Sequence, residues 1–200
     1  MSKKSKTPKP PKAALADPSK LKPFTKKGAE STTGTANSGD KLLQVIIETP
    51  KGCRNKYSFD EDQKIFVLKA ALPAGMVFPY DFGFLPRTLA DDGDPIDVLV
   101  LMDEPAFVGC ALMARLIGVI EGEQTDKQQT VRNDRLVAVA DTAHMWANTK
   151  SIKDLPKKAL KEVEEFFVNY HELQGKKYKL LAVKGKKAAL TLIEKARKKA

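Results

Sequence analysis

Short apolar segments rich in β-branched residues follow one another from residue 42 to about 140, and helical spacing appears only afterwards. Four of these segments have the length and composition of buried strands: LLQVIIE, PIDVLVLM, ALMARLIGVI and RLVAVA. NKYSFDEDQKIFVL predicts a hairpin that turns at residues 60–63. A chain that forms its strands first and its helices last favours a small barrel with helices packed outside. We therefore expect an α+β fold.

Two helices are expected near the C-terminus. Asp154 is predicted to cap the first helix, with Pro156 in its first turn and Gly175 at its end. Its apolar positions recur at helical spacing, at Leu160, Val163, Phe167 and Tyr170. A second helix is expected at about residues 187–198.

The formal net charge of +10 is unevenly distributed along the chain. Residues 1–40 hold nine lysines against three acidic residues, and residues 176–200 hold nine lysines and one arginine against one glutamate, so the middle is acidic. Phe24 is the one aromatic residue among the lysines of residues 1–40, too few for a base-stacking surface, which favours solvated ends over nucleic-acid contact. Because that segment has almost no large apolar residues, we expect a disordered basic tail before a single domain at residues 41–200.

Several classes of protein do not fit the composition. No run of eighteen apolar residues occurs, and the charged N-terminal segment lacks the apolar stretch of a secretory signal. Cys53 and Cys110 are too few for a disulfide framework and do not stand at metal-ligand spacing. We expect a cytoplasmic protein with no membrane partner.

Four aspartates lie within seven residues of DDGDPIDVL, residues 91–99, directly before an apolar run. Gly93 and Pro95 bend the backbone there, and like charges so close together repel one another unless a cation lies between them. Oxygen ligands without a nearby histidine or cysteine favour Mg²⁺ or Mn²⁺ over zinc. An EF-hand is excluded because Thr88 and Leu99 stand where acidic ligands are required. We predict a divalent metal site, with an ordinary acidic turn as the alternative.

DGDPIDVLV resembles the signature D-x-D-[PE]-x-D-x of the family I soluble inorganic pyrophosphatases. Further segments are similar to the family and stand in its order over about residues 42–180: VIIETPKG, NKYSFD, VFPYDFGFLP, LVAV and EEFFVNYHELQGKKY. The resemblance implies a five-stranded barrel of the oligonucleotide-binding (OB) type with flanking α-helices. It also implies that inorganic pyrophosphate is hydrolysed to two orthophosphates with Mg²⁺, for which Mn²⁺ is an alternative cation.

The resemblance assigns acidic residues to the reaction. Asp92 and Asp97 match metal-binding aspartates of the family, and Asp94 matches the aspartate that orients or deprotonates the attacking water. Glu48 matches an acid near the metal site, and a surface acid at the end of a strand is its alternative.

Four residues match phosphate-binding positions of the family, namely Lys56, Lys69, Arg135 and Tyr170. Lys69 stands where arginine is usual, so the charge is kept while the bidentate fork is lost. Core packing is the alternative for Tyr170, and both roles can hold because a buried ring can carry a polar hydroxyl.

An acidic loop that ends D-x-K in the family is here the longer EGEQTDKQQTVRNDR. Arg135 matches the lysine of that motif. Strict spacing places Asn133 at the aspartate position, whereas a deletion of one residue places Asp134 there. We expect Asp134 to be the metal ligand, with Asp126 as the second acid of this loop.

Other positions depart from the family pattern. Phe78 and Phe82 lack the hydroxyls of the family's tyrosines, Ser58 replaces a glutamate and His171 replaces a lysine, which we interpret as an exposed histidine at a helix end. These losses leave a second function open, a catalytically weakened module that binds phosphate or nucleic acid. Three carboxylates aimed at one place favour the enzyme, which we expect to be a homo-oligomer that binds pyrophosphate and no nucleic acid.

Overall fold

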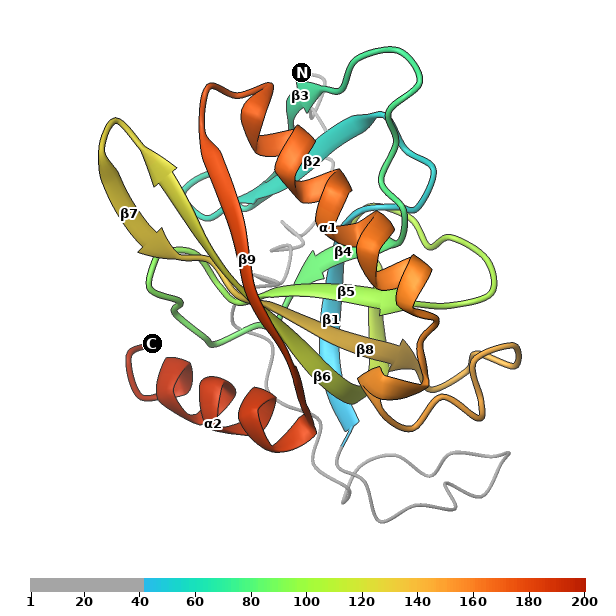
Figure 1. The fold of residues 1–200 in the computed structure, drawn as a ribbon. Helices are drawn as coiled ribbons and strands as arrows, with labels where there is room; N and C mark the ends of the chain where they lie inside the picture. The colour runs from blue at the N-terminus through green and yellow to red at the C-terminus, as the bar shows by residue number, and fades with distance from the viewer. Residues whose placement is uncertain (1–41) are drawn as a thin grey trace, which may run out of the picture.

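The computed structural model describes residues 42–200, and the predicted basic tail at residues 1–40 lies outside them. Five strands form a closed ring through their pairing, and Figure 1 labels each of them. In order around the ring they are β1 (Leu42–Thr49), β4 (Asp81–Phe84), β5 (Asp97–Leu101), β8 (Arg135–Ala140) and β6 (Ala111–Asp126). β5 and β8 run parallel, and the other neighbours in the ring are antiparallel. The predicted α+β fold with a five-stranded ring is confirmed.

The ring is uneven because its strands differ greatly in length. β4 has 4 residues, whereas β6 has 16 and pairs with four other strands. The first half of β6 closes the ring against β1 and β8. Its second half extends beyond the ring and pairs with β7 (Gln129–Arg132) and β9 (Lys177–Gly185). The sequence analysis missed β4, β7 and β9.

A separate hairpin stands beside the ring. It consists of β2 (Asn55–Asp60) and β3 (Ile65–Ala71), and it confirms the hairpin predicted from the sequence. The Asp60 carboxylate accepts hydrogen bonds from the backbone N–H groups of Asp62 and Gln63 in the turn. Thr49 and Tyr57 exchange two hydrogen bonds, which attach the hairpin to the end of β1.

Two α-helices cover the sheet: α1 (Lys157–Glu172) packs against β9, and α2 (Lys186–Arg197) packs against β6 and β9 (Figure 1). The prediction that Asp154 caps the first long helix is wrong. Its carboxylate accepts from the backbone N–H groups of Lys150 and Ser151, and it thereby closes a capping box around the short 3₁₀ helix η2 (Ile152–Asp154). Leu155 before the proline is extended, so α1 begins only after Pro156.

The core fills the ring and continues beneath both helices. Its buried side chains come mainly from the apolar strands, and α1 adds Val163 and Phe167 while α2 adds Ala189 and Ile193. Burial of such aliphatic and aromatic side chains stabilises the fold by about 1.5–3 kcal/mol for each large one. Within residues 42–200, each helix is too short or too polar to cross a bilayer.

Candidate active site

A broad open cavity of about 770 Å³ lies between the ring, the β2–β3 hairpin and α1. Eight of the residues predicted for the site line it: Glu48, Lys56, Lys69, Asp92, Asp94, Asp97, Arg135 and Tyr170. They come from the hairpin, three strands of the ring, the loop before β5, and α1. The fold therefore gathers in one cavity acidic and basic groups that lie far apart in the sequence.

The loop before β5 turns tightly and presents its aspartates in sequence. Gly93 has a φ of 94°, a left-handed conformation that favours glycine. The backbone N–H of Ala90 donates to the carbonyl of Asp94 at 2.8 Å, and the N–H of Asp94 donates to the Asp92 carboxylate at 3.3 Å. Asp97, three residues later, opens β5. The aspartates are therefore part of a turn, and three of them also line the cavity.

The carboxyl group of Asp97 is the most perturbed acid of the cavity. Burial raises its pKa to about 7, although the charges of Arg135 and Lys56 act in the opposite direction. The negative charges of Glu48 and Asp92 raise it further. A quarter of the side chain, 24%, stays accessible from the cavity. Without a cation, the Asp97 carboxyl is therefore only partly ionised at pH 7.

Glu48 is buried and held by three donors. Lys56 Nζ lies 3.0 Å from one carboxylate oxygen, and the other accepts from the Phe59 N–H at 2.7 Å and from the Ser58 hydroxyl at 3.3 Å. The alternative of a surface acid at a strand end is wrong, because Glu48 is only 7% exposed. Its carboxylate fixes the hairpin to β1 and orients Lys56 toward the cavity.

The two phenylalanines that replace tyrosines lie beneath the ammonium of Lys56. Its Nζ is 4.3 Å from the centre of the Phe82 ring and 5.9 Å from that of Phe78. A cation over an aromatic face is favoured by about 0.5–2 kcal/mol, depending on desolvation. These rings have lost hydroxyls that could bind phosphate, but they still position a basic residue.

Arg135 is enclosed between two aromatic rings. Its guanidinium carbon lies 3.9 Å from the centre of the Phe167 ring and 4.7 Å from that of Tyr178, and the residue is only 2% exposed. Nη1 donates to the Asn133 carbonyl at 3.2 Å, and Nε lies 3.7 Å from the Asp97 carboxylate. The side chain is therefore fixed at the wall of the cavity, beside the predicted metal-binding acid.

The prediction that His171 is exposed is wrong. The residue is 3% exposed, and its ring stacks on Tyr178 with centroids 4.9 Å apart. Burial lowers its pKa to about 4, and the positive charge of Arg135 lowers it further, so the ring is neutral at pH 7. Nδ1 lies 2.7 Å from the Phe167 carbonyl, to which the neutral ring donates. His171 therefore does not replace the charge of the family's lysine.

The other predicted phosphate-binding residues border the same cavity. Tyr170 stacks on Phe166, with centroids 5.9 Å apart, so its ring packs as the alternative expects while the residue also lines the cavity. Lys69 is exposed on the hairpin. Lys176, which the sequence analysis did not single out, adds another positive charge to the cavity wall.

Comparison with known proteins accounts for this gathering of residues. A family model described as inorganic pyrophosphatase matches residues 45–200. This chain belongs to the inorganic pyrophosphatase family. The inorganic pyrophosphatase of Synechocystis is 42% identical over 153 residues, which are 76% of this chain and 88% of that protein. The one from Geobacillus stearothermophilus is 37% identical over 155 residues, which are 78% and 92% of the two chains.

Solved pyrophosphatase structures share the fold. The crystal structure of the Thermus thermophilus inorganic pyrophosphatase aligns with a TM-score of 0.74 at 29% identity, covering 84% of this chain and 95% of that chain. The Helicobacter pylori inorganic pyrophosphatase aligns with a TM-score of 0.71 at 31% identity, covering 84% and 98%. These matches confirm the family predicted from the sequence.

The segment expected to be a long acidic loop is a β-hairpin in this pyrophosphatase. β6 and β7 pair from Glu123 to Arg132, and the turn between them places Lys127 and Gln128 at positive φ. Asp126 lies at the tip, where its carboxylate is 47% exposed and 3.3 Å from Lys176 Nζ. It does not border the cavity. The residues that lengthen this segment therefore build a projecting hairpin.

Asn133, and not Asp134, faces the cavity. The side-chain amide of Asn133 donates to the Gln124 side-chain oxygen at 2.9 Å, and both residues line the cavity. Asn133 Oδ1 is buried and has no hydrogen-bond partner among residues 42–200. A neutral amide pair therefore stands where the sequence analysis expected an acid. No sequence signal marked Gln124, because its partner is set by the register of the hairpin.

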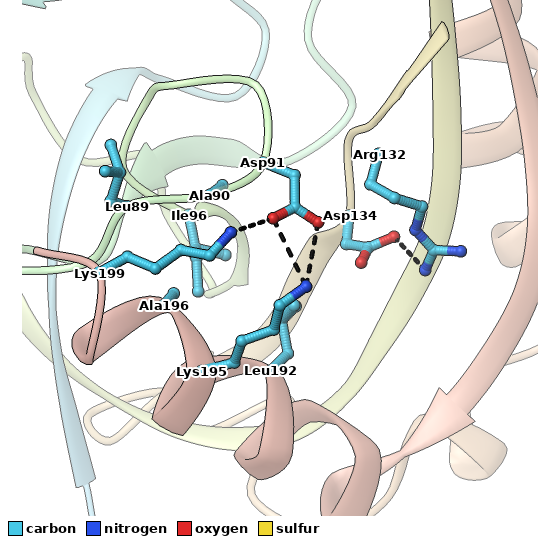
Figure 2. Close-up of a pocket in the computed structure, with 10 residues that line it drawn as sticks. All are labelled: Leu89, Ala90, Asp91, Ile96, Arg132, Asp134, Leu192, Lys195, Ala196 and Lys199. Atoms are coloured by element: carbon cyan, nitrogen blue, oxygen red, sulfur yellow. Dashed lines mark hydrogen bonds and ion pairs between the residues drawn. The ribbon is translucent and has the colours of Figure 1, made fainter.

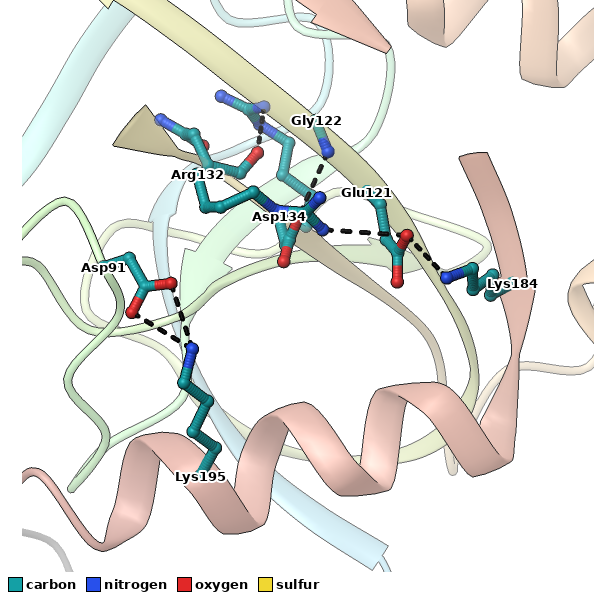
Figure 3. Close-up of polar contacts among 9 residues, drawn as sticks. Asp91, Glu121, Gly122, Arg132, Asp134, Lys184 and Lys195 are labelled. Atoms are coloured by element: carbon teal, nitrogen blue, oxygen red, sulfur yellow. Dashed lines mark hydrogen bonds and ion pairs between the residues drawn. The ribbon is translucent and has the colours of Figure 1, made fainter. Parts of the chain in front are cut away.

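Asp134, directly before β8, points away from the cavity. One of its carboxylate oxygens accepts from the Gly122 N–H at 3.0 Å and from Arg132 Nη2 at 2.7 Å (Figures 2 and 3). It lines a small pocket beside α2 and not the cavity of the aspartates. Asn133 and Asp134 form the short link between β7 and β8, where neighbouring side chains of the extended chain point to opposite sides. The position does not fit the expectation that Asp134 is a metal ligand.

The acidic side of the cavity fits Mg²⁺ by its chemistry. Its donors are carboxylate oxygens, and the pKa of Asp97, raised mainly by burial and further by Glu48 and Asp92, marks a carboxylate that a cation would stabilise. Between residues 42 and 200, no three side chains of aspartate, glutamate, histidine or cysteine form a preassembled cluster. Mg²⁺ commonly binds through one or two carboxylates, waters and substrate phosphates, so an open arrangement is compatible with it. Asp92 and Asp97 are the residues of this loop that would hold it, with Asp94 beside them.

Proposed function

We propose that this protein hydrolyses inorganic pyrophosphate to two orthophosphates with Mg²⁺, or with Mn²⁺ in its place. One observation carries the proposal: Asp92, Asp94 and Asp97 share a single cavity with Lys56, Lys69 and Arg135. Carboxylates alone would repel a pyrophosphate anion, and basic groups alone would not activate water. The close relatives named inorganic pyrophosphatases support this assignment.

The acidic side of the cavity would prepare the nucleophile. Mg²⁺ held by Asp92 and Asp97 would supply an acidic water molecule and neutralise part of the substrate charge. Asp94 is exposed to the cavity, so its carboxylate can orient this water and accept its proton. Asp97 has to release its own proton to bind the cation, because its pKa is about 7 in the absence of metal.

The basic side would bind the substrate and stabilise the leaving phosphate. Arg135 is fixed between Phe167 and Tyr178, and Lys56 is fixed by Glu48, so both cations are already in place when substrate arrives. Preorganised charges of this kind act on the negative charge that develops on the departing phosphate. Lys69 and Tyr170 would add contacts at the rim.

Phosphate release from pyrophosphate, with and without Mg²⁺, tests the proposal. We expect turnover only with the divalent cation, and we expect Asp94→Asn to serve as an inactive control of unchanged fold. A second candidate is a phosphate-binding module without catalysis, which the loss of charge at His171 and the amide at Asn133 favour. Calorimetric binding of pyrophosphate without any turnover would support that candidate. A homo-oligomeric assembly and a cytoplasmic location stay predictions.

A further inference from the structure

Asp91 begins the acidic loop but does not line the cavity with Asp92 and Asp94. Its carboxylate lies on the other side of the loop, in a small pocket formed with α2 and with the segment around Arg132 (Figure 2). Lys195 Nζ lies 3.2 Å from one of its oxygens, and Lys199 Nζ contacts the other. The loop thus divides its acidic residues between two faces.

The C-terminal end of α2 contacts the same loop through its backbone. The N–H of Leu89 donates to the carbonyl of Ala196 at 3.1 Å. The helix itself is anchored, because Ala189, Ile193 and Ala196 are buried against the core. An anchored helix end and two lysines therefore hold the beginning of the acidic loop, and basic residues are favoured at this end of a helix.

A second group of ion pairs supports the neighbouring strand. Arg132 bridges Asp134 and Glu121, and Lys184 lies 2.9 Å from Glu121 (Figure 3). These residues lie around the start of β8, which pairs with the start of β5 at Asp97. The aspartate loop is thus held on the side away from the cavity at both of its ends.

Charge repulsion explains why such support is needed. Asp91, Asp92 and Asp94 lie within four residues, and before a cation binds, their mutual repulsion favours opening of the turn. Lys195 and Lys199 neutralise the one carboxylate that is turned away from the cavity. This leaves the Asp92 carboxylate for the cation and the Asp94 carboxylate for the water molecule beside it.

We propose that Lys195 and Lys199 are positioning residues that hold the acidic loop, through Asp91, in its cation-binding conformation before metal arrives. The inference rests on the proposed function for its consequence, which is a lower Mg²⁺ requirement. The lysine side chains are 60% and 40% exposed, so the effect is that of surface ion pairs and acts on the loop more than on the whole fold.

The first test measures amide hydrogen exchange of residues 89–96 in the metal-free protein, which requires no activity. In the double variant Lys195→Ala/Lys199→Ala, we expect these amides to exchange about fivefold faster, as the loss of roughly 1 kcal/mol of local stabilisation predicts. The matched control is Lys187→Ala on the same helix, since no ion pair joins that lysine to the described residues. Unchanged exchange in the double variant would overturn the proposal.

The second test follows phosphate release against Mg²⁺ concentration. We expect the double variant to need about threefold more Mg²⁺ for half-maximal rate, with the same rate at saturation, since the loss of surface ion pairs has small effects. A lower melting temperature with an unmoved Mg²⁺ curve and unmoved loop exchange would show that the lysines only stabilise the fold, against the proposal. If the parent protein does not hydrolyse pyrophosphate, the exchange measurement still decides the positioning role.

A variant with the charges of Asp91 and Lys195 exchanged distinguishes loss of their ion pair from a general loss of folding. In Asp91→Lys/Lys195→Asp, one opposite-charge pair is restored with the partners reversed, so we expect loop exchange closer to the parent than in Asp91→Lys alone. Equal exchange in the single and the double variant would contradict a direct pairing of these residues, because coupled residues show non-additive effects.

Discussion

The guanidinium of Arg135 lies 3.9 Å from the centre of the Phe167 ring, while its Nε is 3.7 Å from the Asp97 carboxylate. One buried side chain thus joins the helix α1, the wall of the cavity and the predicted metal ligand. A planar guanidinium can stack on rings and still donate hydrogen bonds at its edge, which an ammonium cannot do in the same way.

Arg135→Lys is therefore expected to impair the enzyme although it keeps the charge. The lysine would lose both ring contacts and the planar fork that we propose binds phosphate oxygens, so we expect kcat/KM for pyrophosphate to fall by about tenfold or more. Steady-state kinetics at saturating Mg²⁺ measures this loss. Lys69→Arg is the matched control, because an exposed side chain at the rim should tolerate the exchange with little change. A kcat/KM equal to that of the parent protein in Arg135→Lys would show that the contacts of Arg135 with the two rings have no role in catalysis.

Asp94→Asn is expected to reduce turnover by about 10²–10⁴, the usual cost of removing a general base. The amide keeps the size of the side chain but does not accept the proton. Because Asp94 is exposed and its side chain forms no ion pair with the described residues, the melting temperature should stay close to that of the parent. Near-parental turnover at saturating Mg²⁺ would exclude Asp94 as the base.

Asn133 and Asp134 are expected to differ in their effect on the Mg²⁺ requirement. Asp134→Ala removes a carboxylate that binds the Gly122 N–H and Arg132, so we expect about 1–3 kcal/mol lower stability and an unmoved Mg²⁺ curve. Asn133→Asp places a negative charge in the cavity, and we expect it to lower the Mg²⁺ concentration needed for half-maximal rate. The rate of phosphate release as a function of Mg²⁺ concentration, together with the melting temperature, measures both effects in each variant. A large shift of the curve in Asp134→Ala would restore the assignment made from the sequence.

The raised pKa of Asp97 predicts a pH-dependent stability of the metal-free protein. Its pKa in the fold is about 7, above the ordinary 3.8, so its stabilising contribution is complete below pH 3.8, declines as the pH rises, and is fully lost only once the pH has passed 7. His171 changes the stability in the opposite direction. Its folded pKa of about 4 lies below the ordinary 6.5, so its contribution is complete above pH 6.5 and is lost as the pH falls from there toward 4.

Between about pH 6.5 and 8, the melting temperature of the metal-free parent should therefore fall more than that of Asp97→Asn. Mg²⁺ should abolish much of the fall in the parent, since a bound cation favours the ionised carboxylate. Equal slopes for the two proteins would mean that Asp97 is not the group that titrates.

Removal of the basic segment is expected to leave the chemistry intact. A chain that begins at Gly39 should keep the parental turnover and melting temperature, because the sequence of residues 1–40 offers almost no apolar side chains for docking. Enzyme kinetics and calorimetry of the shortened chain measure both quantities. A large loss of either would show that the segment folds onto the domain.

Much of the fold could be predicted because the ring strands are buried and apolar. Runs such as RLVAVA are fully buried in β8, and the Asp60 turn marked the hairpin. β9 was missed because its residues are mostly exposed and include three lysines, so no buried-strand pattern was present. β7 was missed because its turn uses Lys127 and Gln128 at positive φ in place of the usual glycine or asparagine.

Site residues that are close in sequence were predicted correctly to lie together. Those that are brought together only by strand pairing were missed. Asp92, Asp94 and Asp97 belong to one loop, so spacing sufficed. The amide pair of Gln124 and Asn133 depends on the register of β6 and β7, which no local pattern fixes. The burial of His171 depends on Tyr178, a neighbour contributed by the unpredicted β9.

The closure of the ring by β6 has a consequence for biosynthesis. β1 can pair with its second neighbouring strand only after β6 has been synthesised. β6 in turn can pair with β9 only after residues 177–185 have been synthesised. Asp91 lies 104 and 108 positions before Lys195 and Lys199, the lysines that contact it. Such long-range pairing slows folding, because distant segments have to meet before their contacts form. Until α2 has been synthesised, a nascent chain therefore carries its aspartate loop without these partners.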